Sequence, residues 1–323
     1  MKNRKIIASI IIPVLNEENF ISKCVESIIS ETKYIKEIEI LIIDGGSKDK
    51  TIKVIENLIS KYSFIKLLHN KKKITPAALN IGIKHADGKY IIRLDAHAEY
   101  GKNYVDNCIA AIESAEESIA NVGGTIETKP SKNTFFAKSI SICLSSKFGV
   151  GNSSFRISKP KESRYVDTVP FGCFRKTIFK EIGSFNENEP RNEDLEFNKR
   201  IIRSGKKILL VPNITSIYFS RPDIKSFVLQ QFDNGKIVTN KFRGGSAFHN
   251  LRHFTPFFFV TYLIIFLSLF SLLDKGILKF ISFTPLIAYL LLNFFFSIYL
   301  AIKKNLLFFP SLFFTYILLH VSY

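Results

Sequence analysis

The sequence predicts an α/β protein with a mostly parallel central sheet and C-terminal transmembrane helices. Four apolar, β-branched runs alternate with helix-type patterns in the first hundred residues, as in parallel sheets covered by helices. Each strand-to-helix loop carries polar residues, at the edge where open α/β sheets bind ligands. From residue 257 onward Phe, Leu and Ile dominate and charges are few, which is typical of membrane segments.

The first half of the chain contains four predicted strands, at residues 6–13, 38–43, 64–68 and 90–94. After the first strand, Asn16, Glu17 and Glu18 open a helix whose apolar residues recur at i, i+4 and i+7. Asp49 is the expected cap of a second helix. Pro76 begins a third. Each helix therefore provides a crossover between neighbouring strands.

The middle third follows a less regular pattern. Residues 121–128 and 169–174 are predicted strands that contain glycine, where backbone can approach closely. Residues 148–162 are polar and predict a mobile loop. A helix begins at Glu193 and Asp194 and ends at Gly205. A further strand at 208–212 and an amphipathic helix at 224–242 follow.

Residues 90–99 form the stretch with the clearest chemical signal. A buried strand runs into Asp95 and His97, which project to the same side if the chain stays extended. Both side chains can bind a metal, which suggests an anionic ligand held through a divalent cation. The alternative is a strand-terminating Asp with a surface His, and this stretch alone leaves both open. Neither a G-x-G-x-x-G fingerprint nor a P-loop is present, which disfavours a dinucleotide or Walker-type site.

The net charge of +17 over 323 residues is spread over scattered lysines, without an Arg-rich stretch that interleaves aromatics. This pattern predicts a solvated basic surface with no nucleic-acid partner, and attraction to an anionic membrane face. The four cysteines are far apart in apolar surroundings, so we expect buried free thiols. No secretory signal is visible, because the first apolar run is short and leads into polar residues.

Three apolar runs occupy residues 257–273, 280–302 and 306–321. A spanning helix needs ~20 apolar residues, which the middle run exceeds and the outer two approach. Lys303 and Lys304 favour the cytoplasmic side. We therefore expect a cytoplasmic domain at 1–250, with an interface helix near 224–242, and a membrane region at 251–323. This is a multi-pass arrangement in the cell membrane, and a hairpin plus an interfacial helix is the alternative.

A series of motifs between residues 9 and 196 points to one family. They are Ser-Ile-Ile-Ile-Pro-Val-Leu-Asn-Glu-Glu at 9–18, Ile-Asp-Gly-Gly-Ser-Lys-Asp-Lys-Thr at 43–51, Pro-Ala-Ala-Leu-Asn-Ile-Gly at 76–82, Arg-Leu-Asp-Ala-His at 93–97 and Glu-Asp-Leu-Glu at 193–196. In this order they resemble family 2 glycosyltransferases, over roughly residues 6–215. The Asp-Ala-His-Ala form is most similar to the branch with succinoglycan-type membrane glucosyltransferases. The resemblance implies the GT-A fold of nucleotide-diphospho-sugar transferases.

The resemblance also implies roles for individual residues. It assigns donor binding to Pro13, Asn16, Glu17, Asp44, Ser47, Asn80 and Asp95. Asp44 corresponds to the acid that contacts uracil, and Asp95 with His97 to the Asp-x-Asp motif that holds Mg²⁺ or Mn²⁺. Asp194, with Glu193 beside it, corresponds to the catalytic base of inverting enzymes. An imidazole suits Mg²⁺ less well than oxygen does, so His97 either binds the metal or contacts a phosphate.

The implied activity is inverting transfer of a sugar from a nucleotide sugar, a UDP-sugar, to a hydroxyl of a lipid-linked glycan in cell-surface polysaccharide synthesis. The Gln-x-x-Arg-Trp signature of processive synthases is missing, which favours transfer of a single sugar. One alternative is a polyprenyl-monophosphate glycosyltransferase. With either acceptor, His249, Arg252 and His253 would serve its phosphate, or they form a juxtamembrane anchor. A non-catalytic membrane scaffold is disfavoured by the intact acids.

Overall fold

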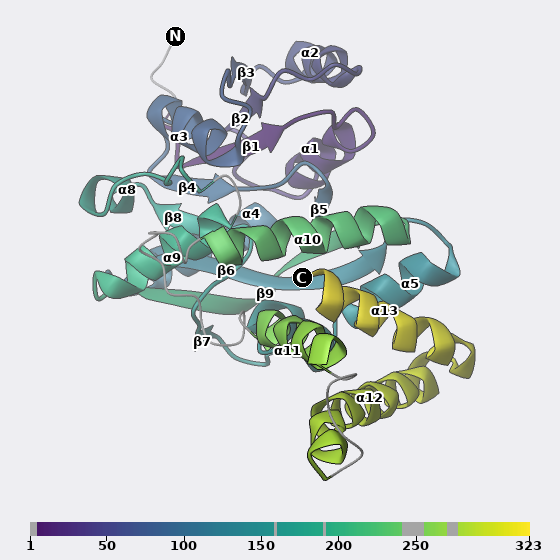
Figure 1. Ribbon diagram of the computed structural model, residues 1–323. Helices are drawn as coiled ribbons and strands as arrows, with labels where there is room; N and C mark the ends of the chain where they lie inside the picture. The colour runs from purple at the N-terminus through teal and green to yellow at the C-terminus, as the bar shows by residue number, and fades with distance from the viewer. Residues whose placement is uncertain (1–4, 158–159, 190–191, 241–254, 270–276) are drawn as a thin grey trace. The chain divides into compact units, whose positions relative to one another are not determined.

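The computed structural model describes residues 5–157, 160–189, 192–240, 255–269 and 277–323 (Figure 1). The chain divides into two compact units. The first comprises Met1–Glu127 and Ser154–Tyr218, and the second comprises Thr128–Ser153 and Phe219–Tyr323. The first unit carries a large sheet with helices on both faces, whereas the second is mainly helical.

The sheet and its covering helices are formed by the following elements. In chain order they are β1 (Ala8–Val14), α1 (Ile21–Ile29), β2 (Ile38–Asp44), α2 (Thr51–Lys61), β3 (Ile65–His69), α3 (Thr75–His85), β4 (Tyr90–Arg93), β5 (Ala98–Tyr100), α4 (Tyr104–Ser114), β6 (Ile119–Pro130), α7 (Ser154–Ile157), β7 (Arg164–Tyr165), β8 (Cys173–Arg175), α8 (Ile178–Glu181), α9 (Glu193–Arg203) and β9 (Lys207–Ser220). The first four strands match the predicted ones to within a few residues.

The sheet is mixed. Its strand order is β3-β2-β1-β4-β8-β6-β9-β5, and β7 pairs with β9. The four strands from β3 to β4 run parallel. The pairs β4–β8, β6–β8, β5–β9 and β7–β9 are antiparallel. The prediction of a mostly parallel sheet is therefore right for the first half and wrong for the second, where no regular succession of helical crossovers sets the strand direction.

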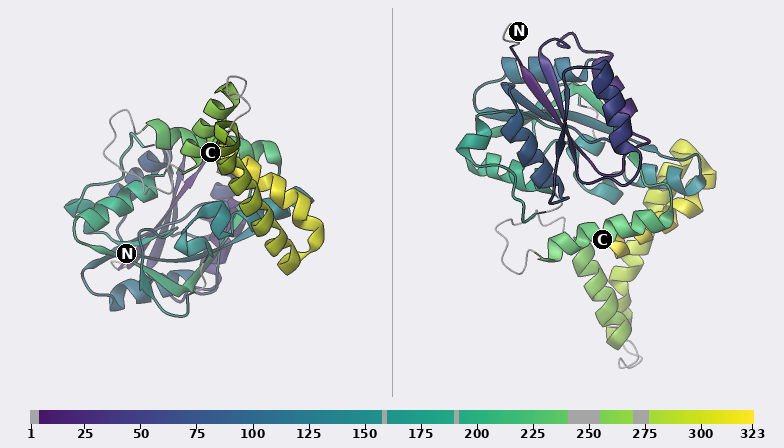
Figure 2. Two further views of the ribbon diagram at one scale, coloured as in Figure 1. Left: turned by 60° about the horizontal axis from the view of Figure 1, so that its bottom comes forward. Right: turned by 90° about the horizontal axis from the view of Figure 1, so that it is seen from above.

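The two faces of the sheet are buried by different helices (Figures 1 and 2). Ile10 and Ile12 point to the face that α1, α2 and α4 cover, and Ile11 points to the face covered by α3, α8 and α9. Successive strand residues alternate between faces, so a continuous run of isoleucine fills both cores. The buried strands thereby hold their carboxyl ends at one fixed edge.

Two predicted element boundaries shift, each beside a residue with a positive φ. Helix α1 begins at Ile21 and not at residues 16–18, where Asn16 has a φ of 57°. The predicted strand at 169–174 is reduced to β8, because Phe171 has a φ of 47° that ends extended structure. Asp49 accepts the Thr51 N–H at 3.0 Å, but the N-cap residue of α2 is Lys50 and not Asp49 as predicted.

Two further expectations concern the loop at 148–162 and the cysteines. The predicted loop contains the short helix α7 and part of α6 (Lys147–Val150). All four cysteines are buried and free, as predicted.

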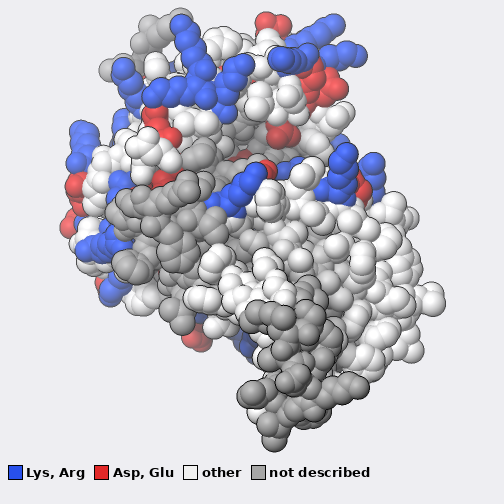
Figure 3. All heavy atoms as spheres, in the orientation of Figure 1, with Lys and Arg blue, Asp and Glu red and all other residues white. Residues whose placement is uncertain are grey.

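The second unit is built from apolar helices. It contains α5 (Phe135–Cys143), α6, α10 (Ile224–Asn240), α11 (Thr255–Leu269), α12 (Ile277–Lys304), the short η3 (Leu306–Phe308) and α13 (Phe309–Ser322). A small core joins α5, α10 and α13 around Phe227 and Tyr316. Hydrogen bonds between the hydroxyls of Ser139 and Ser311 (2.6 Å) and of Ser146 and Tyr316 (2.7 Å) add to this packing. Figure 3 shows few charged atoms over α12 and α13.

One helix among the residues that the structure describes is long and apolar enough to cross a membrane. It spans Ile281–Lys304, with a mean hydropathy of 2.0. The neighbouring apolar helices at Thr255–Phe266 and Leu306–Ser322 are shorter. The prediction of several transmembrane helices is therefore not confirmed. The predicted phosphate-facing residues His249, Arg252 and His253 lie outside the described residues.

Helix α3 packs closely against β1 through Gly82, and this contact can be tested. A Cβ at Gly82 would lie 2.5 Å from Ile11 Cγ2, closer than the two atoms can approach. Alanine normally stabilises a helix by up to about 1 kcal/mol over glycine. Here we expect Gly82→Ala to lower the free energy of unfolding by about 1–3 kcal/mol. Denaturant titration of the purified protein measures this.

The matched experiment adds Ile11→Ala, which removes the clashing atoms. The double variant should be less destabilised than the sum of the two single variants. Simple additivity, or a stabilised Gly82→Ala single variant, would refute the close contact.

Candidate active site

A cavity of about 230 Å³ opens in the first unit beyond the carboxyl ends of β1, β2 and β4. This is the edge at which open α/β sheets bind ligands. Its lining consists of Pro13, Val14, Leu15, Glu17, Ile43, Gly45, Asn70, Lys73, Ile74, Thr75, Ala78, Arg93, Asp95, Ala96, His97 and Glu193. The predicted residues Pro13, Glu17, Asp95, His97 and Glu193 are thus brought to one cavity.

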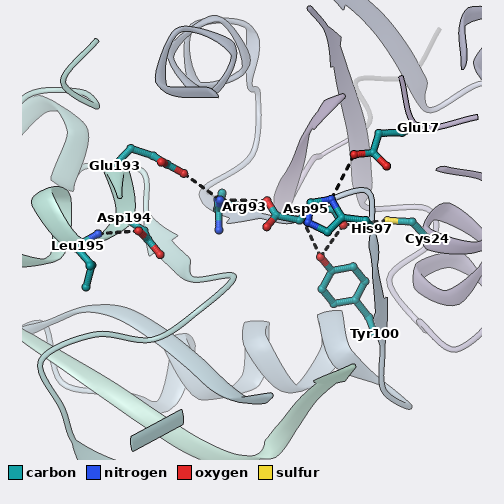
Figure 4. A network of polar contacts seen from close by, with 9 residues as sticks. All are labelled: Glu17, Cys24, Arg93, Asp95, His97, Tyr100, Glu193, Asp194 and Leu195. Carbon is teal, nitrogen blue, oxygen red and sulfur yellow. Dashed lines mark hydrogen bonds and ion pairs between the residues drawn. The ribbon is translucent and has the colours of Figure 1, made fainter. Parts of the chain in front are cut away.

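Asp95 is fixed by contacts to both groups of its backbone (Figure 4). The Tyr100 hydroxyl accepts the Asp95 N–H at 2.7 Å and donates to the Asp95 carbonyl oxygen at 3.0 Å. The Cys24 thiol donates to the same carbonyl oxygen at 3.6 Å. The carboxylate is then presented to the cavity, where its Oδ1 lies 3.0 Å from Arg93 Nη2. Asp95 is consequently held in place before any ligand arrives.

His97 lies on the same wall and faces a carboxylate. Its Nδ1 is 3.2 Å from Glu17 Oε1. Its ring makes an edge contact with Tyr218, with 5.9 Å between centroids. Because a carboxylate partner orients an imidazole, Glu17 helps to fix the orientation of the His97 ring.

Glu193 and Asp194 stand in the first turn of α9, where acidic side chains are favoured by the helix dipole. Asn192, in the left-handed conformation with φ 58°, turns the chain into this helix. Glu193 is buried, and its Oε1 lies 2.9 Å from Arg93 Nη2. Asp194 is half-buried beside it and does not line the cavity. Its Oδ1 accepts the Leu195 N–H at 2.8 Å (Figure 4).

The burial of these groups changes their acidity. Burial raises the pKa of Glu193 to about 7, against the opposing effect of the Arg93 guanidinium. Burial alone would lower the pKa of Arg93, but the carboxylates of Asp95, Glu193 and Asp194 outweigh it and raise the pKa. The cavity therefore contains a permanently charged guanidinium among several acids, and Lys73 lies in the same lining.

Several residues with an implied donor-binding role make contacts within the protein instead of lining the cavity. Asp44 accepts the N–H groups of Gly46 (2.8 Å) and Ser47 (3.1 Å). Ser47 Oγ accepts the Asn16 N–H at 2.9 Å. These bonds hold together the loops after β1 and β2. Asp44, Ser47 and Asn16 thus shape the rim of the cavity through its backbone.

Asn80 also lies away from the cavity lining. Its amide nitrogen donates to the Phe185 carbonyl oxygen at 2.9 Å and to Glu187 at 3.0 Å, and its oxygen accepts the Phe185 N–H at 2.9 Å. Asn80 therefore ties α3 to the segment before α9.

Three residues of this site carried no role in the sequence-based prediction. Arg93 bridges two acids, Tyr100 clamps Asp95, and Lys73 lines the cavity. A signal existed for Arg93, because it is a charged residue at the end of an otherwise apolar strand. Nothing in the sequence pattern distinguishes Lys73 from its two lysine neighbours.

The side chains that line the cavity fit a divalent cation that binds together with a nucleotide. No group of three or more His, Cys, Asp or Glu side chains among residues described by the structure could hold a metal alone. Mg²⁺ is commonly held by one or two carboxylates together with substrate phosphates. Asp95 offers one such carboxylate at the cavity wall, and His97 lies beside it.

The raised pKa of Glu193 predicts a pH dependence of stability. Between its ordinary pKa of 4.5 and about 7, the folded chain holds a proton that the unfolded chain releases. The free energy of unfolding should therefore fall as pH rises through this window, by up to about 3 kcal/mol. Glu193→Gln removes the titrating carboxyl group. The stability of the variant relative to that of wild type should therefore increase from pH 5 to pH 8. Denaturant titrations at both pH values measure this, and parallel pH curves would contradict it.

The comparisons with known proteins point to one family. The model for "Glycosyl transferase family 2" matches residues 9–183. The dolichyl N-acetyl-alpha-D-glucosaminyl phosphate 3-beta-D-2,3-diacetamido-2,3-dideoxy-beta-D-glucuronosyltransferase of Methanococcus voltae is 35% identical over 279 residues, which cover 84% of this chain and 83% of that protein. The succinoglycan biosynthesis protein ExoA of Rhizobium meliloti is 26% identical over 76% of this chain and 73% of its own length.

A solved structure supports the fold. A mannosyltransferase from Pyrobaculum calidifontis, in complex with GDP-Man and Mn²⁺, aligns with a TM-score of 0.61 at 13% identity. The alignment covers 99% of this chain and 86% of that one. The GT-A-like fold is therefore confirmed. With the family model and the Methanococcus voltae relative, it follows that this chain is a glycosyltransferase of family 2.

Proposed function

We propose that this chain is an inverting enzyme that transfers one sugar from a UDP-sugar to a hydroxyl of a lipid-linked glycan, with Mg²⁺ or Mn²⁺. The observation that carries the proposal is the placement of Asp95 and Glu193 on opposite sides of Arg93, in one cavity of a family 2 chain. Such an arrangement places one acid beside the nucleotide-sugar donor and another beside the sugar acceptor.

Asp194 is the proposed base, because it is half-buried and adjacent to the cavity acid Glu193. Its carboxylate would accept the proton of the acceptor hydroxyl as that oxygen attacks the anomeric carbon. Glu193 is less suited, since its carboxylate already contacts Arg93. When bound, the divalent cation would neutralise the departing diphosphate, and Asp95, with His97 beside it, would hold that cation.

The proposed acceptor class is supported by the relatives. The Methanococcus voltae protein is named for transfer to a dolichyl phosphate that already carries N-acetylglucosamine. ExoA is named for succinoglycan biosynthesis. A sugar hydroxyl on a lipid phosphate is thus favoured over a bare polyprenyl monophosphate. Both point to synthesis of cell-surface glycans.

Helix α12 supports membrane attachment. Only 17% of its most apolar window is buried within the protein, and large side chains such as Leu291 and Phe295 are exposed. Water-exposed apolar surface of this extent is unfavourable in a soluble protein. Lys303 and Lys304 end the helix, as is common at the edge of a membrane.

The catalytic proposal is tested with detergent-purified protein, a panel of UDP- and GDP-sugars, Mn²⁺ and a lipid-linked glycan acceptor. Asp194→Asn should lower kcat by about 10²–10⁴-fold, because the acceptor loses its base. Asp95→Asn should mainly weaken metal-dependent donor binding and raise KM for the donor. Release of nucleoside diphosphate measures both.

Glu181→Gln is the matched control. It removes an exposed carboxylate of the same unit that pairs with Lys206 at 3.3 Å and does not line the cavity, so it should leave turnover unchanged. If Asp194→Asn and Asp95→Asn both retained wild-type turnover, the proposed site would be wrong.

Membrane attachment is tested separately by washing cell membranes with alkaline carbonate. A chain inserted through α12 should stay in the membrane pellet, because ~20 buried apolar residues resist removal of surface charge. Recovery of the full chain in the supernatant would show that it is held only by charge.

A further inference from the structure

A single buried arginine lies between the acids on the two sides of the cavity. Arg93 Nη2 contacts Asp95 Oδ1 at 3.0 Å and Glu193 Oε1 at 2.9 Å. Figure 4 shows the guanidinium between the two carboxylates, with Asp194 on the side of Glu193. The residue is 9% exposed and ends the buried strand β4. The positive charge of Arg93 thus compensates the negative charge of Asp95, on the donor side, and that of Glu193, on the acceptor side.

The position of Arg93 is fixed by a backbone in a disfavoured conformation. The Arg93 N–H donates to the Gly172 carbonyl oxygen at 3.0 Å, and the guanidinium lies 5.8 Å from the Phe171 ring centroid. Phe171 has a φ of 47°, which is unusual for a large side chain. The Tyr104 hydroxyl donates to the Phe171 carbonyl oxygen at 2.9 Å and holds it there. Such strain is found mainly at functional sites.

The hydrogen bonding of the guanidinium is incomplete. Within the described part of the chain, Arg93 Nε is buried and has no hydrogen-bond partner. Leaving a buried donor unpaired is costly, so a residue serving the fold alone would be expected to have this group satisfied. The ion pairs of Arg93 with Asp95 and Glu193 are both made by Nη2. The side chain is therefore placed to serve the two carboxylates.

We propose that Arg93 is a positioning residue that takes the place of a cation between Asp95 and Glu193, and thereby makes binding of a divalent cation depend on the nucleotide. This inference rests on the proposed function for the metal-binding role of Asp95. A carboxylate that is paired with a guanidinium is a poorer metal ligand, and the negative charge around it is already compensated. The phosphate oxygens of a nucleotide supply the further ligands that shift the balance toward the metal.

The test measures Mn²⁺ binding to the detergent-purified full chain by electron paramagnetic resonance, without nucleotide and with UDP. Arg93→Gln removes the competing cation, so this variant should bind Mn²⁺ without nucleotide at least about tenfold more tightly than wild type. The additional tightening caused by UDP should be correspondingly smaller than in wild type. Arg93→Lys retains the charge and should stay within about threefold of wild type.

Arg200→Gln is the matched control on α9. Arg200 pairs with Glu196 at 2.8 Å in the same helix and does not line the cavity. This variant should lose thermal stability without any change in Mn²⁺ affinity. If Arg93 served only the fold, Arg93→Gln would bind Mn²⁺ no more tightly than wild type, and that result would overturn the inference. Should the glutamine variant not fold, Arg93→Met fits the apolar strand and carries the same expectation.

Failure of the proposed function has a different signature. Wild-type protein would then release no nucleoside diphosphate from any nucleotide sugar. The nucleotide-free comparison of Mn²⁺ affinities is read independently of turnover, so it still decides the role of Arg93.

Discussion

The ion contacts that Arg93 makes with Asp95 and Glu193 join the two halves of the mixed sheet at the cavity. The parallel half presents Asp95 just beyond β4, and the antiparallel half leads the chain to α9 and Glu193. When both are ionised, two carboxylates that share one guanidinium at 3.0 Å and 2.9 Å repel each other strongly in this buried setting. Without a cation between the two carboxylates, their repulsion would destabilise the packing that forms the cavity.

The sequence was sufficient for the first half of the fold and insufficient for the second. Continuous β-branched runs such as β1 and β2 are typical of strands buried on both faces, and the helices between them impose parallel pairing. In the second half, β8 has three residues and β9 has fourteen. Strands β6 and β9 also approach each other closely at Gly124, where a Cβ would lie 1.6 Å from the Ile214 carbonyl oxygen. Such contacts leave no periodic pattern.

The position of the candidate site was predictable in part. Asp95 and His97 were expected at the ligand-binding edge and line the cavity, as does Glu193. Asp44 and Asp194 were expected across the same cleft, and neither lines the cavity. Residues whose side chains bind the protein were harder to place. Asn80 was assigned to the donor, yet its amide holds Phe185 and Glu187, because a motif does not reveal which partner an amide will find. The roles of Arg93 and Tyr100 depend on contacts that only the folded chain brings together.

The clamp on Asp95 has a thermodynamic consequence. Because the Tyr100 hydroxyl bonds both the N–H and the carbonyl oxygen of Asp95, the loop after β4 loses its conformational entropy during folding. Binding of a ligand at this side of the cavity therefore costs little conformational entropy of the protein, so more of the contact energy appears as affinity. The heat-capacity change of binding should accordingly reflect burial of the ligand itself, without the larger contribution that coupled folding would add.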